Sequence, residues 1–289
     1  MLKFNTKTPV MITGATGYVA GELVKKLLTN GFTVHAPVRD PNDPEKLKYL
    51  NQISQDTKGK IKYFKADLLE EGSYLEAMRA LNYPETPTFG VHAGNLGYFQ
   101  EVSLNGLSEF LRLIKQDQVR TDLRNMLEVT TGITGHSQVK AINDVVVSRD
   151  SSQAMKAELT IGAGRFARFI GDGLIVATAQ GSTAYAAAAG GPIIEQAAPV
   201  FSVVPSNAHD TVMYESLRAP LVVSDEQQIA IRALEHERRR VKIEIDGRQV
   251  DHEQGEIITI KKSSNQLRVL RPTTFDFIQH LATKLIQRS

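Results

Sequence analysis

Residues 171–185 read Gly-Asp-Gly-Leu-Ile-Val-Ala-Thr-Ala-Gln-Gly-Ser-Thr-Ala-Tyr. The apolar run at 174–178 is short and follows a glycine pair, which is typical of a buried strand. The next stretch, 181–185, combines a glycine, two hydroxyl side chains and a tyrosine. A strand that ends in such a loop presents backbone N–H groups and hydroxyls at its edge, so we expect a polar ligand to bind there.

Working outward, the chain from about Asp122 onward is dominated by short β-prone runs. The clearest is a hairpin at 241–250, where apolar residues alternate on either side of Asp246-Gly247, a favoured type I′ turn pair. Further strands are expected at 126–131, 141–148, 155–161, 165–170, 174–178, 201–204, 221–223, 228–231, 257–260 and 267–270. This half is therefore predicted to be mostly antiparallel β, closed by a helix over 275–286.

The first part of the chain instead alternates strands with helices. Strands are predicted at 9–13, 33–38 and 61–65, and helices at 17–28, 45–53 and 72–81. This alternation is the signature of βαβ units and a parallel sheet. A fourth strand at 88–92, which we expect to pair beside the first three, precedes a glycine-containing loop at 93–97 and a helix at 104–114.

The predicted fold class is α/β plus all-β. A Rossmann-like parallel α/β domain is expected over 1–120 and an antiparallel β-rich domain over 121–270. The terminal helix, 271–289, is expected to pack back on the α/β domain.

Composition limits the function. The 289 residues are 42% hydrophobic, enough for a proper core, and the net charge of +2 argues against nucleic acid or a membrane surface as the main partner. Cysteine is absent, and the seven histidines show no paired spacing for a metal. With no apolar window approaching 18 residues and no apolar run at 1–8, we expect no spanning helix, no secretory signal and a cytoplasmic location.

Basic residues change type along the chain. Residues 1–84 hold 10 Lys and 2 Arg, whereas 85–289 hold 7 Lys and 15 Arg. Because Lys and Arg are nearly interchangeable on a solvated surface, this reversal indicates two sequence origins joined near 82–88.

A glycine loop follows the first predicted strand. It reads Thr-Gly-Ala-Thr-Gly-Tyr-Val-Ala-Gly over 13–21 and opens a predicted helix, where backbone N–H groups can approach a pyrophosphate. Residues 7–80 resemble the extended short-chain dehydrogenase/reductase family, with Gly14 and Gly17 matching its glycines. The resemblance implies that Arg39 lies near a ribose 2′-phosphate, hence NADP, and that Asp67 contacts adenine. The alternative is a retained turn that binds nothing.

The chemistry of that family is missing. Its reductases need a Tyr four residues before a Lys, which lowers the phenol pKa for proton transfer. None of the eight tyrosines has a Lys at that spacing. An NADP-dependent reductase is therefore only a remote alternative.

Three later segments, in order and spacing, resemble ATP-dependent NAD kinase over about 85–289. They are Gly-Val-His-Ala-Gly-Asn-Leu-Gly-Tyr at 90–98, Ala-Ile-Asn-Asp-Val-Val at 141–146, and 171–185 with Gly-Gly-Pro at 190–192. The resemblance implies that Asn143 and Asp144 grip a ribose of the bound dinucleotide and that Tyr185 stacks on or hydrogen-bonds to it. It also implies binding roles for Leu96, Tyr98, Asp172, Thr183, Ala184 and Asp246. Taken alone, Asn143-Asp144, Asp172 and Asp246 each also fit a turn or a cap.

One family motif is absent. NAD kinases carry a Gly-Gly-Asp-Gly-Thr loop that cradles the ATP phosphates and supplies an aspartate at the 2′-hydroxyl. Here Asp67 stands after a strand as a possible substitute base, but Leu68 and Leu69 would crowd a triphosphate. A smaller departure is Ala188, where family members often have Ser.

The sequence therefore predicts a chimera of reductase-derived and kinase-derived segments, and the abrupt Lys/Arg change favours engineering. We expect an NAD kinase-like protein that binds NAD or NADP, is impaired in catalysis, and uses ATP and Mg²⁺ if active, with no metal ligands among its own residues. A non-catalytic NAD(P)-binding chimera is the alternative. The family resemblance also implies a homo-oligomer, either a dimer or a tetramer.

Overall fold

The computed structural model describes residues 9–12, 15–38, 40–65, 73–80, 82–83, 85–92, 100–103, 106–131, 137–209, 216–234 and 240–285. The chain divides into two compact units. The α/β unit comprises Met1–Leu123 and Leu267–Ser289, and the β unit comprises Arg124–Gln266.

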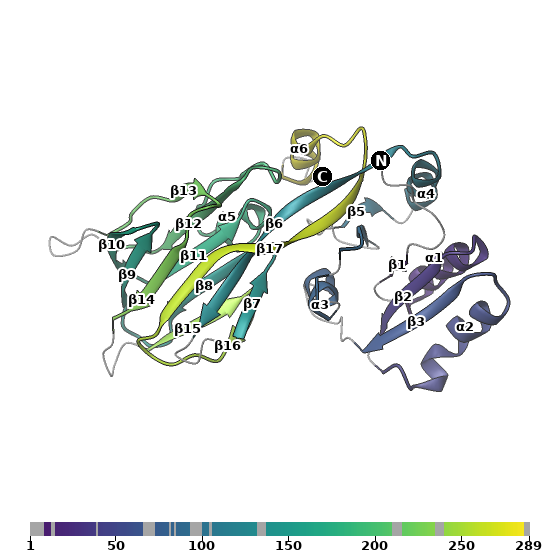
Figure 1. Ribbon diagram of the computed structural model, residues 1–289, viewed down its shortest axis with the longest axis horizontal. Helices are drawn as coiled ribbons and strands as arrows, with labels where there is room; N and C mark the ends of the chain where they lie inside the picture. Colours follow the sequence, from purple (N-terminus) through teal and green to yellow (C-terminus); the bar gives the residue numbers. More distant parts are fainter. Residues whose placement is uncertain are drawn as a thin grey trace. The chain divides into compact units, whose positions relative to one another are not determined.

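The α/β unit contains a parallel three-stranded sheet in the order β1-β2-β3, formed by Val10–Met11, Thr33–Val38 and Lys60–Lys65. Helices α1 (Tyr18–Thr29) and α2 (Pro44–Gln55) lie beside this sheet (Figure 1). Apolar residues of both helices join those of β2 in one buried cluster, which includes Leu23, Val24, Leu27, Leu28, Val34, Ala36, Leu47, Leu50 and Ile53. The strand–helix alternation predicted for this part is confirmed.

The next elements are α3 (Ser73–Ala80), β4 (Gly90–His92), β5 (Gln100–Ser103) and α4 (Leu107–Lys115). In the part that the structure describes, β4 pairs in parallel with β5 and not with the first three strands, so the expected continuous sheet was wrong.

The residue Thr88, just before β4, has a different strand partner. The Thr88 amide donates to the Arg268 carbonyl at 2.8 Å, and its carbonyl accepts from the Leu270 amide at 2.8 Å. The backbone groups of Thr88 thus pair with the end of a later strand, β17 (Ile257–Pro272).

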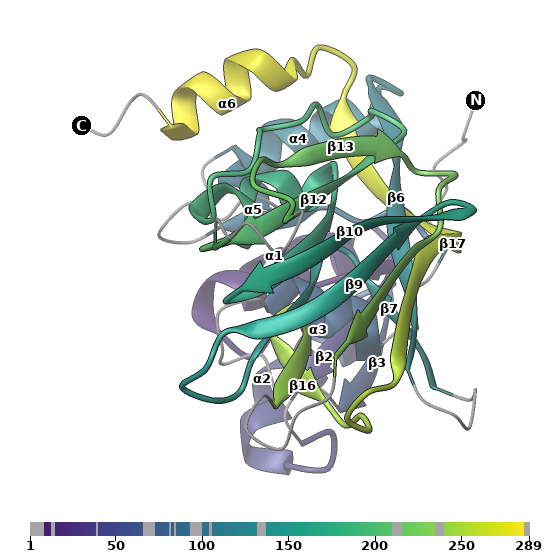
Figure 2. The ribbon, with the colours of Figure 1, turned by 90° about the vertical axis from the view of Figure 1, so that its left-hand side faces the viewer.

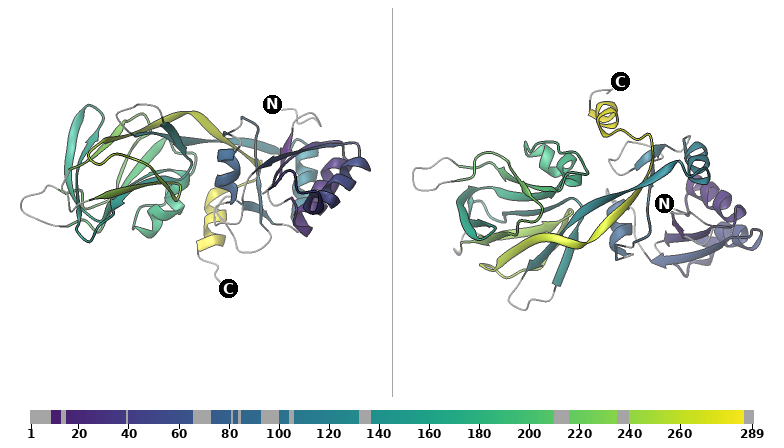
Figure 3. Two further views of the ribbon diagram at one scale, coloured as in Figure 1. Left: turned by 90° about the horizontal axis from the view of Figure 1, so that it is seen from below. Right: turned by 45° about the horizontal axis from the view of Figure 1, so that its top comes forward.

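The β unit is built from two six-stranded sheets (Figure 1 and Figure 3). One sheet has the order β10-β9-β14-β17-β6-β7 and the other β13-β12-β11-β8-β15-β16. The hairpin of β9 and β10 faces the viewer in Figure 2. The strand bounds are Val119–Thr131 (β6), Ser137–Ala141 (β7), Asp144–Arg149 (β8), Met155–Ile161 (β9), Gly164–Gly171 (β10), Gly173–Thr178 (β11), Val200–Ser206 (β12), Leu221–Ser224 (β13), Ile229–Ala233 (β14), Val241–Ile245 (β15) and Arg248–Val250 (β16).

The core of this unit takes side chains from both sheets, among them Leu127, Val147, Leu159, Phe169, Val176, Phe201, Ile231, Ile243 and Ile258. On the opposite face of β11 a second cluster forms, where Ile175 and Ala177 pack with Ala186 of the short helix α5 (Tyr185–Ala188). Strand β11 is therefore buried on both faces, which explains its uninterrupted apolar run.

Two strand predictions need correction. The single strand expected at 141–148 is interrupted, because β7 ends at Ala141 and β8 begins at Asp144. The strands expected at 257–260 and 267–270 are one strand, β17. The hairpin turn is confirmed: Asp246 and Gly247 have φ angles of 47° and 76°, as a type I′ turn requires.

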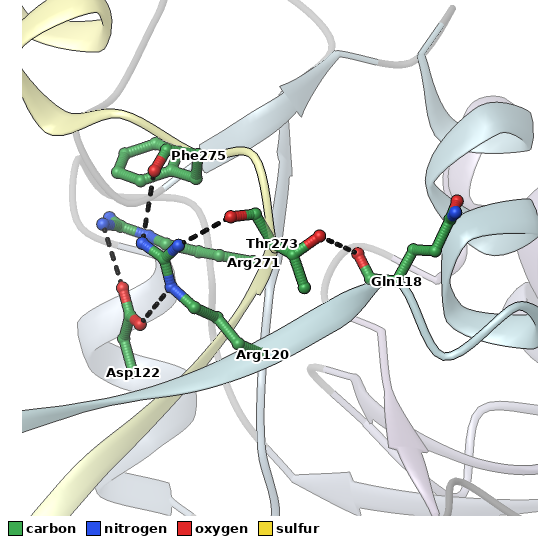
Figure 4. A network of polar contacts seen from close by, with 6 residues as sticks. All are labelled: Gln118, Arg120, Asp122, Arg271, Thr273 and Phe275. Carbon is green, nitrogen blue, oxygen red and sulfur yellow. Dashed lines mark hydrogen bonds and ion pairs between the residues drawn. The ribbon is translucent and has the colours of Figure 1, made fainter.

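Ion pairs and hydrogen bonds of two arginines hold the carboxy-terminal segment within the α/β unit (Figure 4). Arg120 forms an ion pair with Asp122 at 2.9 Å and donates to the Thr273 and Phe275 carbonyls. The buried guanidinium of Arg271 lies 3.8 Å from the centre of the Phe275 ring and 3.5 Å from Asp122. These contacts immediately precede α6 (Phe277–Leu285). No helix in the described part of the chain is long and apolar enough to cross a membrane.

Candidate functional site

The candidate site is the bend between β7 and β8, which we call the corner and define as Ile142, Asn143 and Asp144. Asn143 is 9% exposed and Asp144 4% exposed. The interruption that the sequence did not predict is therefore the place where an amide and a carboxylate meet, both nearly buried.

The hairpin turn between β15 and β16 holds the corner from one side. The Asp246 carboxylate accepts hydrogen bonds from three successive backbone amides, those of Ile142 (2.9 Å), Asn143 (2.7 Å) and Asp144 (3.1 Å). The Asp246 amide in turn donates to the Asp144 carbonyl at 2.9 Å. A negatively charged acceptor thus satisfies amides that the bend leaves without strand partners.

The end of β11 holds the corner from the other side. The Thr178 amide donates to the Asn143 carbonyl at 2.9 Å, and the Thr178 hydroxyl donates to the Ile142 carbonyl at 2.7 Å. The same hydroxyl accepts from the Gly181 amide at 2.9 Å. One buried threonine therefore connects the corner to the loop that follows β11.

That loop is a short 3₁₀ helix, η1 (Gln180–Thr183), which the sequence did not predict. Its two hydroxyls are buried: Ser182 donates to the Ala179 carbonyl at 2.7 Å and Thr183 to the Gln180 carbonyl at 3.2 Å. Both hydroxyls donate their protons to backbone carbonyls of the loop itself. Thr183 therefore has no hydroxyl proton left for a ligand. Tyr185, at the start of α5 after Ala184, is 52% exposed and accessible to one.

The corner is also electrostatically unusual. Burial, reinforced by the nearby carboxylates of Asp246 and Glu244, raises the pKa of Asp144 from 3.8 to about 7. A carboxyl group with such a pKa exchanges its proton near neutral pH, and such shifts cluster at functional sites.

Asn143 adds an unpaired acceptor. Its Oδ1 atom is buried and accepts no hydrogen bond within the part of the chain that the structure describes. A buried polar atom without a partner lowers stability by about 1–3 kcal/mol unless a ligand or water supplies a donor. Asn143 Oδ1 is thus a buried acceptor that a donor could satisfy, and it belongs to the residue next to the Asp144 carboxyl in the chain.

Asp172 is not part of this arrangement. Asp144 pairs with Ala177 at one end of β11, whereas Asp172 precedes the other end, roughly 17 Å away at about 3.3 Å per residue. Asp172 instead forms an ion pair with Arg149 at 2.7 Å and accepts from Asn207 at 2.8 Å. The Asn207 hydrogen bond, followed by the Arg149 charge, lowers the pKa of Asp172. Its position favours the turn role that the sequence also allowed over the ligand-binding role.

Several predicted site residues lie outside the described residues: Gly14, Arg39, Asp67, Leu96 and Tyr98. Gly17 is described and lies exposed at the N-cap of α1, where its carbonyl accepts from the Gly21 amide at 2.8 Å. Within the described ranges, no three His, Asp or Glu side chains gather in a metal-binding group.

The structure brings together Asn143, Asp144 and Asp246 and adds Thr178, which the sequence-based prediction did not assign to the site. The signal for Thr178 was its place as the last residue of a fully apolar strand, three residues before Gly181. A hydroxyl at such a strand end can reach the loop amide that follows.

Comparisons with known proteins show the family to which the chain is similar. Residues 142–272 match the model of the ATP-NAD kinase C-terminal domain family. The chain is 31% identical over 219 residues to the NAD kinase of Sulfurimonas denitrificans, covering 74% of each protein. It is 30% identical over 221 residues to the NAD kinase of Clostridium botulinum strain Kyoto, covering 76% of each.

Solved structures share the fold. Yeast NADH kinase complexed with NADH superposes with a TM-score of 0.78 at 17% identity, covering 98% of this chain and 89% of that one. An NAD kinase from Archaeoglobus fulgidus in complex with ATP gives 0.65 at 22% identity, covering 96% and 98%. The fold likeness therefore extends over the α/β unit as well as the β unit.

Proposed function

This chain belongs to the NAD kinase family, and on that premise we propose that its corner at residues 142–144 binds a nicotinamide dinucleotide, NAD or NADP. Relatives are NAD kinases, and a solved structure of the same fold contains NADH. The ligand class fits a site made of two adjacent acceptors, because a ribose carries two adjacent hydroxyl donors.

The observation that carries the proposal is the buried Asn143 Oδ1 atom, which has no hydrogen-bond partner among the described residues. The backbone that carries this side chain is held by Asp246 and Thr178, so the point from which the side-chain amide extends is fixed. A ribose hydroxyl that donates to Oδ1 would satisfy this atom.

The proposed roles follow from position. Asn143 orients one ribose hydroxyl, and Asp144 accepts from the neighbouring hydroxyl when its carboxyl is ionised. The exposed ring of Tyr185 offers a stacking surface for a base or a hydroxyl for hydrogen bonding. Each of these groups binds and orients the ligand, and none of them activates a phosphate.

We further propose that phosphoryl transfer from ATP is impaired. The Gly-Gly-Asp-Gly-Thr loop that the resemblance calls for is absent from the sequence, and the substitute Asp67 lacks flanking glycines. Phosphoryl transfer depends on positioning and charge neutralisation, which such a loop supplies. Mg²⁺, where bound, would accompany the ATP phosphates, and we assign it no ligand among the described residues.

The impaired chemistry agrees with a composite origin, in which a reductase-like α/β segment replaces the kinase's own. The Lys/Arg reversal near residue 84 supports that origin. Assembly into a dimer or tetramer remains a prediction, which sedimentation velocity of the full chain can test.

The test of function has two arms. Calorimetric titration with NAD and with NADP should show binding that Asn143→Ala and Tyr185→Ala each weaken, whereas Asn265→Ala, a change on β17, leaves it unchanged. Coupled detection of NADP formed from NAD, ATP and Mg²⁺ should show turnover far below that of an intact family member. Well-folded chain that binds neither dinucleotide contradicts the binding proposal, and full turnover contradicts the impairment.

A further inference from the structure

The carboxylate of Asp246 accepts from every backbone amide of the corner. We propose that Asp246 is a positioning residue, which holds Asn143 and Asp144 in their ligand-binding arrangement without itself contacting the ligand. The inference rests on the proposed function. It reassigns Asp246, which the sequence resemblance placed among the ligand contacts.

Strand register explains how a hairpin turn reaches the corner. Strand β15 pairs antiparallel with β8, with Ile245 opposite Val145. The residue after Ile245 therefore lies beside the one before Val145, which is Asp144. The chain at Asp246 then turns away with a left-handed φ of 47°, a conformation that Asp tolerates better than most residues, and Gly247 continues the turn.

The carboxylate is already engaged at both oxygens. Oδ1 accepts from the Asn143 and Asp144 amides, and Oδ2 accepts from the Ile142 amide. A ligand hydroxyl would have to compete with these charge-assisted bonds. The hydrogen bonds described between Asp246 and these two residues go to their backbone, so they do not use the polar atoms of the Asn143 and Asp144 side chains.

The position of Asp246 has a second consequence for the corner. Its charge lies next to Asp144 and, after burial, is the largest cause that raises the pKa of that carboxyl, followed by Glu244 of β15. Glu244 itself pairs with Lys242 at 3.0 Å. Asp246 thus fixes the backbone of Asp144 and also affects the pH at which its side chain ionises.

Two substitutions separate these effects. Asp246→Ala removes all three acceptor contacts. Asp246→Asn retains one side-chain oxygen, which can still accept from the Asn143 and Asp144 amides, but removes the charge. Asp251→Asn, at an exposed position just after the same hairpin, is the matched control because it removes a charge without touching the corner.

The experiment measures amide hydrogen exchange at residues 142–144 by NMR without ligand, and NAD affinity by calorimetry between pH 5.5 and 8.5 (chosen to bracket the ionisation of Asp144). Asp246→Ala should accelerate exchange at the corner and weaken NAD binding by about tenfold or more. Asp246→Asn should keep the Asn143 and Asp144 amides protected. It should also move the midpoint of the pH dependence of affinity to lower pH by about one unit. Asp251→Asn should match the unmodified chain throughout.

Corner amides that exchange at the original rate in Asp246→Ala, or NAD affinity unchanged there, would overturn the positioning role. An unmoved pH midpoint in Asp246→Asn contradicts the effect of the Asp246 charge on Asp144. If Asp246→Ala does not fold, exchange at Ile142 in Asp246→Asn decides the positioning role, because the side-chain NH₂ group that replaces Oδ2 cannot accept from the Ile142 amide. Unchanged exchange at Ile142 in that variant would overturn the positioning role. Should the unmodified chain bind no NAD, the proposed function fails, while the exchange data still decide whether Asp246 holds the corner.

Discussion

Gly181 lies directly against the backbone of Asn143. A β-carbon built on Gly181 would stand 2.0 Å from the Asn143 carbonyl oxygen and 2.7 Å from its α-carbon. No side chain fits in that space, because both atoms belong to a backbone that Asp246 and Thr178 hold in place. The glycine in the loop after β11 is therefore required by the corner, and not by its own φ angle.

Gly181→Ala should consequently damage both stability and binding. The added methyl group must push the corner away from η1, and overpacking of this kind lowers the free energy of unfolding by about 1–3 kcal/mol. We expect chemical denaturation to show that loss and calorimetry to show weakened NAD binding. Gly164→Ala is the control, since a β-carbon at Gly164 meets nothing within 4 Å. Equal stability of the two variants would contradict the close approach.

Thr178→Val tests the hydroxyl that joins the corner to the loop. Valine keeps the shape of threonine but leaves the Gly181 amide without its acceptor and the Ile142 carbonyl without its side-chain donor. Losing these buried hydrogen bonds should lower the free energy of unfolding by about 1–3 kcal/mol in urea denaturation. Thr178→Ser retains the hydroxyl and should recover most of that loss. If serine proves no better than valine, packing of the methyl group is the main contribution.

The sequence predicted most strands of the β unit because its buried strands are apolar runs, and its hairpin because Asp246-Gly247 has the chemistry of a type I′ turn. It did not predict the break at Ile142-Asn143, since two polar residues between apolar runs do not by themselves end a strand. The break is held by Asp246, about 100 positions later in the chain. Periodicity within a window cannot detect such a contact.

The composition of a motif was also a poor guide to which of its atoms are available. The hydroxyls of Ser182 and Thr183 suggested ligand donors, but both serve the loop's own backbone. Short hydroxyl side chains readily bond to nearby carbonyls, which the sequence alone does not distinguish from ligand binding. Likewise, Thr88 pairs with a strand that lies 180 positions later in the chain, so this pairing had no local signal.

Asp144→Asn should make the protein more stable at neutral pH while weakening NAD binding. Because the folded state raises the pKa of Asp144 from 3.8 to about 7, the folded chain binds this proton more tightly than the unfolded chain does. The free energy of unfolding therefore falls as pH rises from about 4 to 7 and then levels off. Asparagine removes this dependence, so its stability advantage should be small near pH 4 and grow to roughly 2–4 kcal/mol at pH 8.

Asp172→Asn, between β10 and β11, should change stability with the opposite sign. The folded state lowers the pKa of Asp172, so its contribution is present above the ordinary carboxyl range and is lost as pH falls through the lowered value. Urea denaturation of both variants across pH 4–8 should show Asp144→Asn gaining and Asp172→Asn losing stability at neutral pH. Parallel curves for Asp144→Asn and the unmodified chain would contradict the raised pKa.

Arg120→Lys should loosen the attachment of α6. The planar guanidinium of Arg120 donates at the same time to the Asp122 carboxylate and to two carbonyls just before the helix, those of Thr273 and Phe275. A lysine ammonium keeps the charge but cannot reproduce this fork of donors. Since Arg120 is partly exposed, we expect only about 1 kcal/mol of lost stability, together with faster amide exchange in α6. Arg165→Lys is the control, because it alters only an exposed ion pair with Glu158 at 3.9 Å, and it should change neither quantity. Unchanged exchange in α6 after Arg120→Lys would mean that Arg271 and Phe275 suffice to hold the segment.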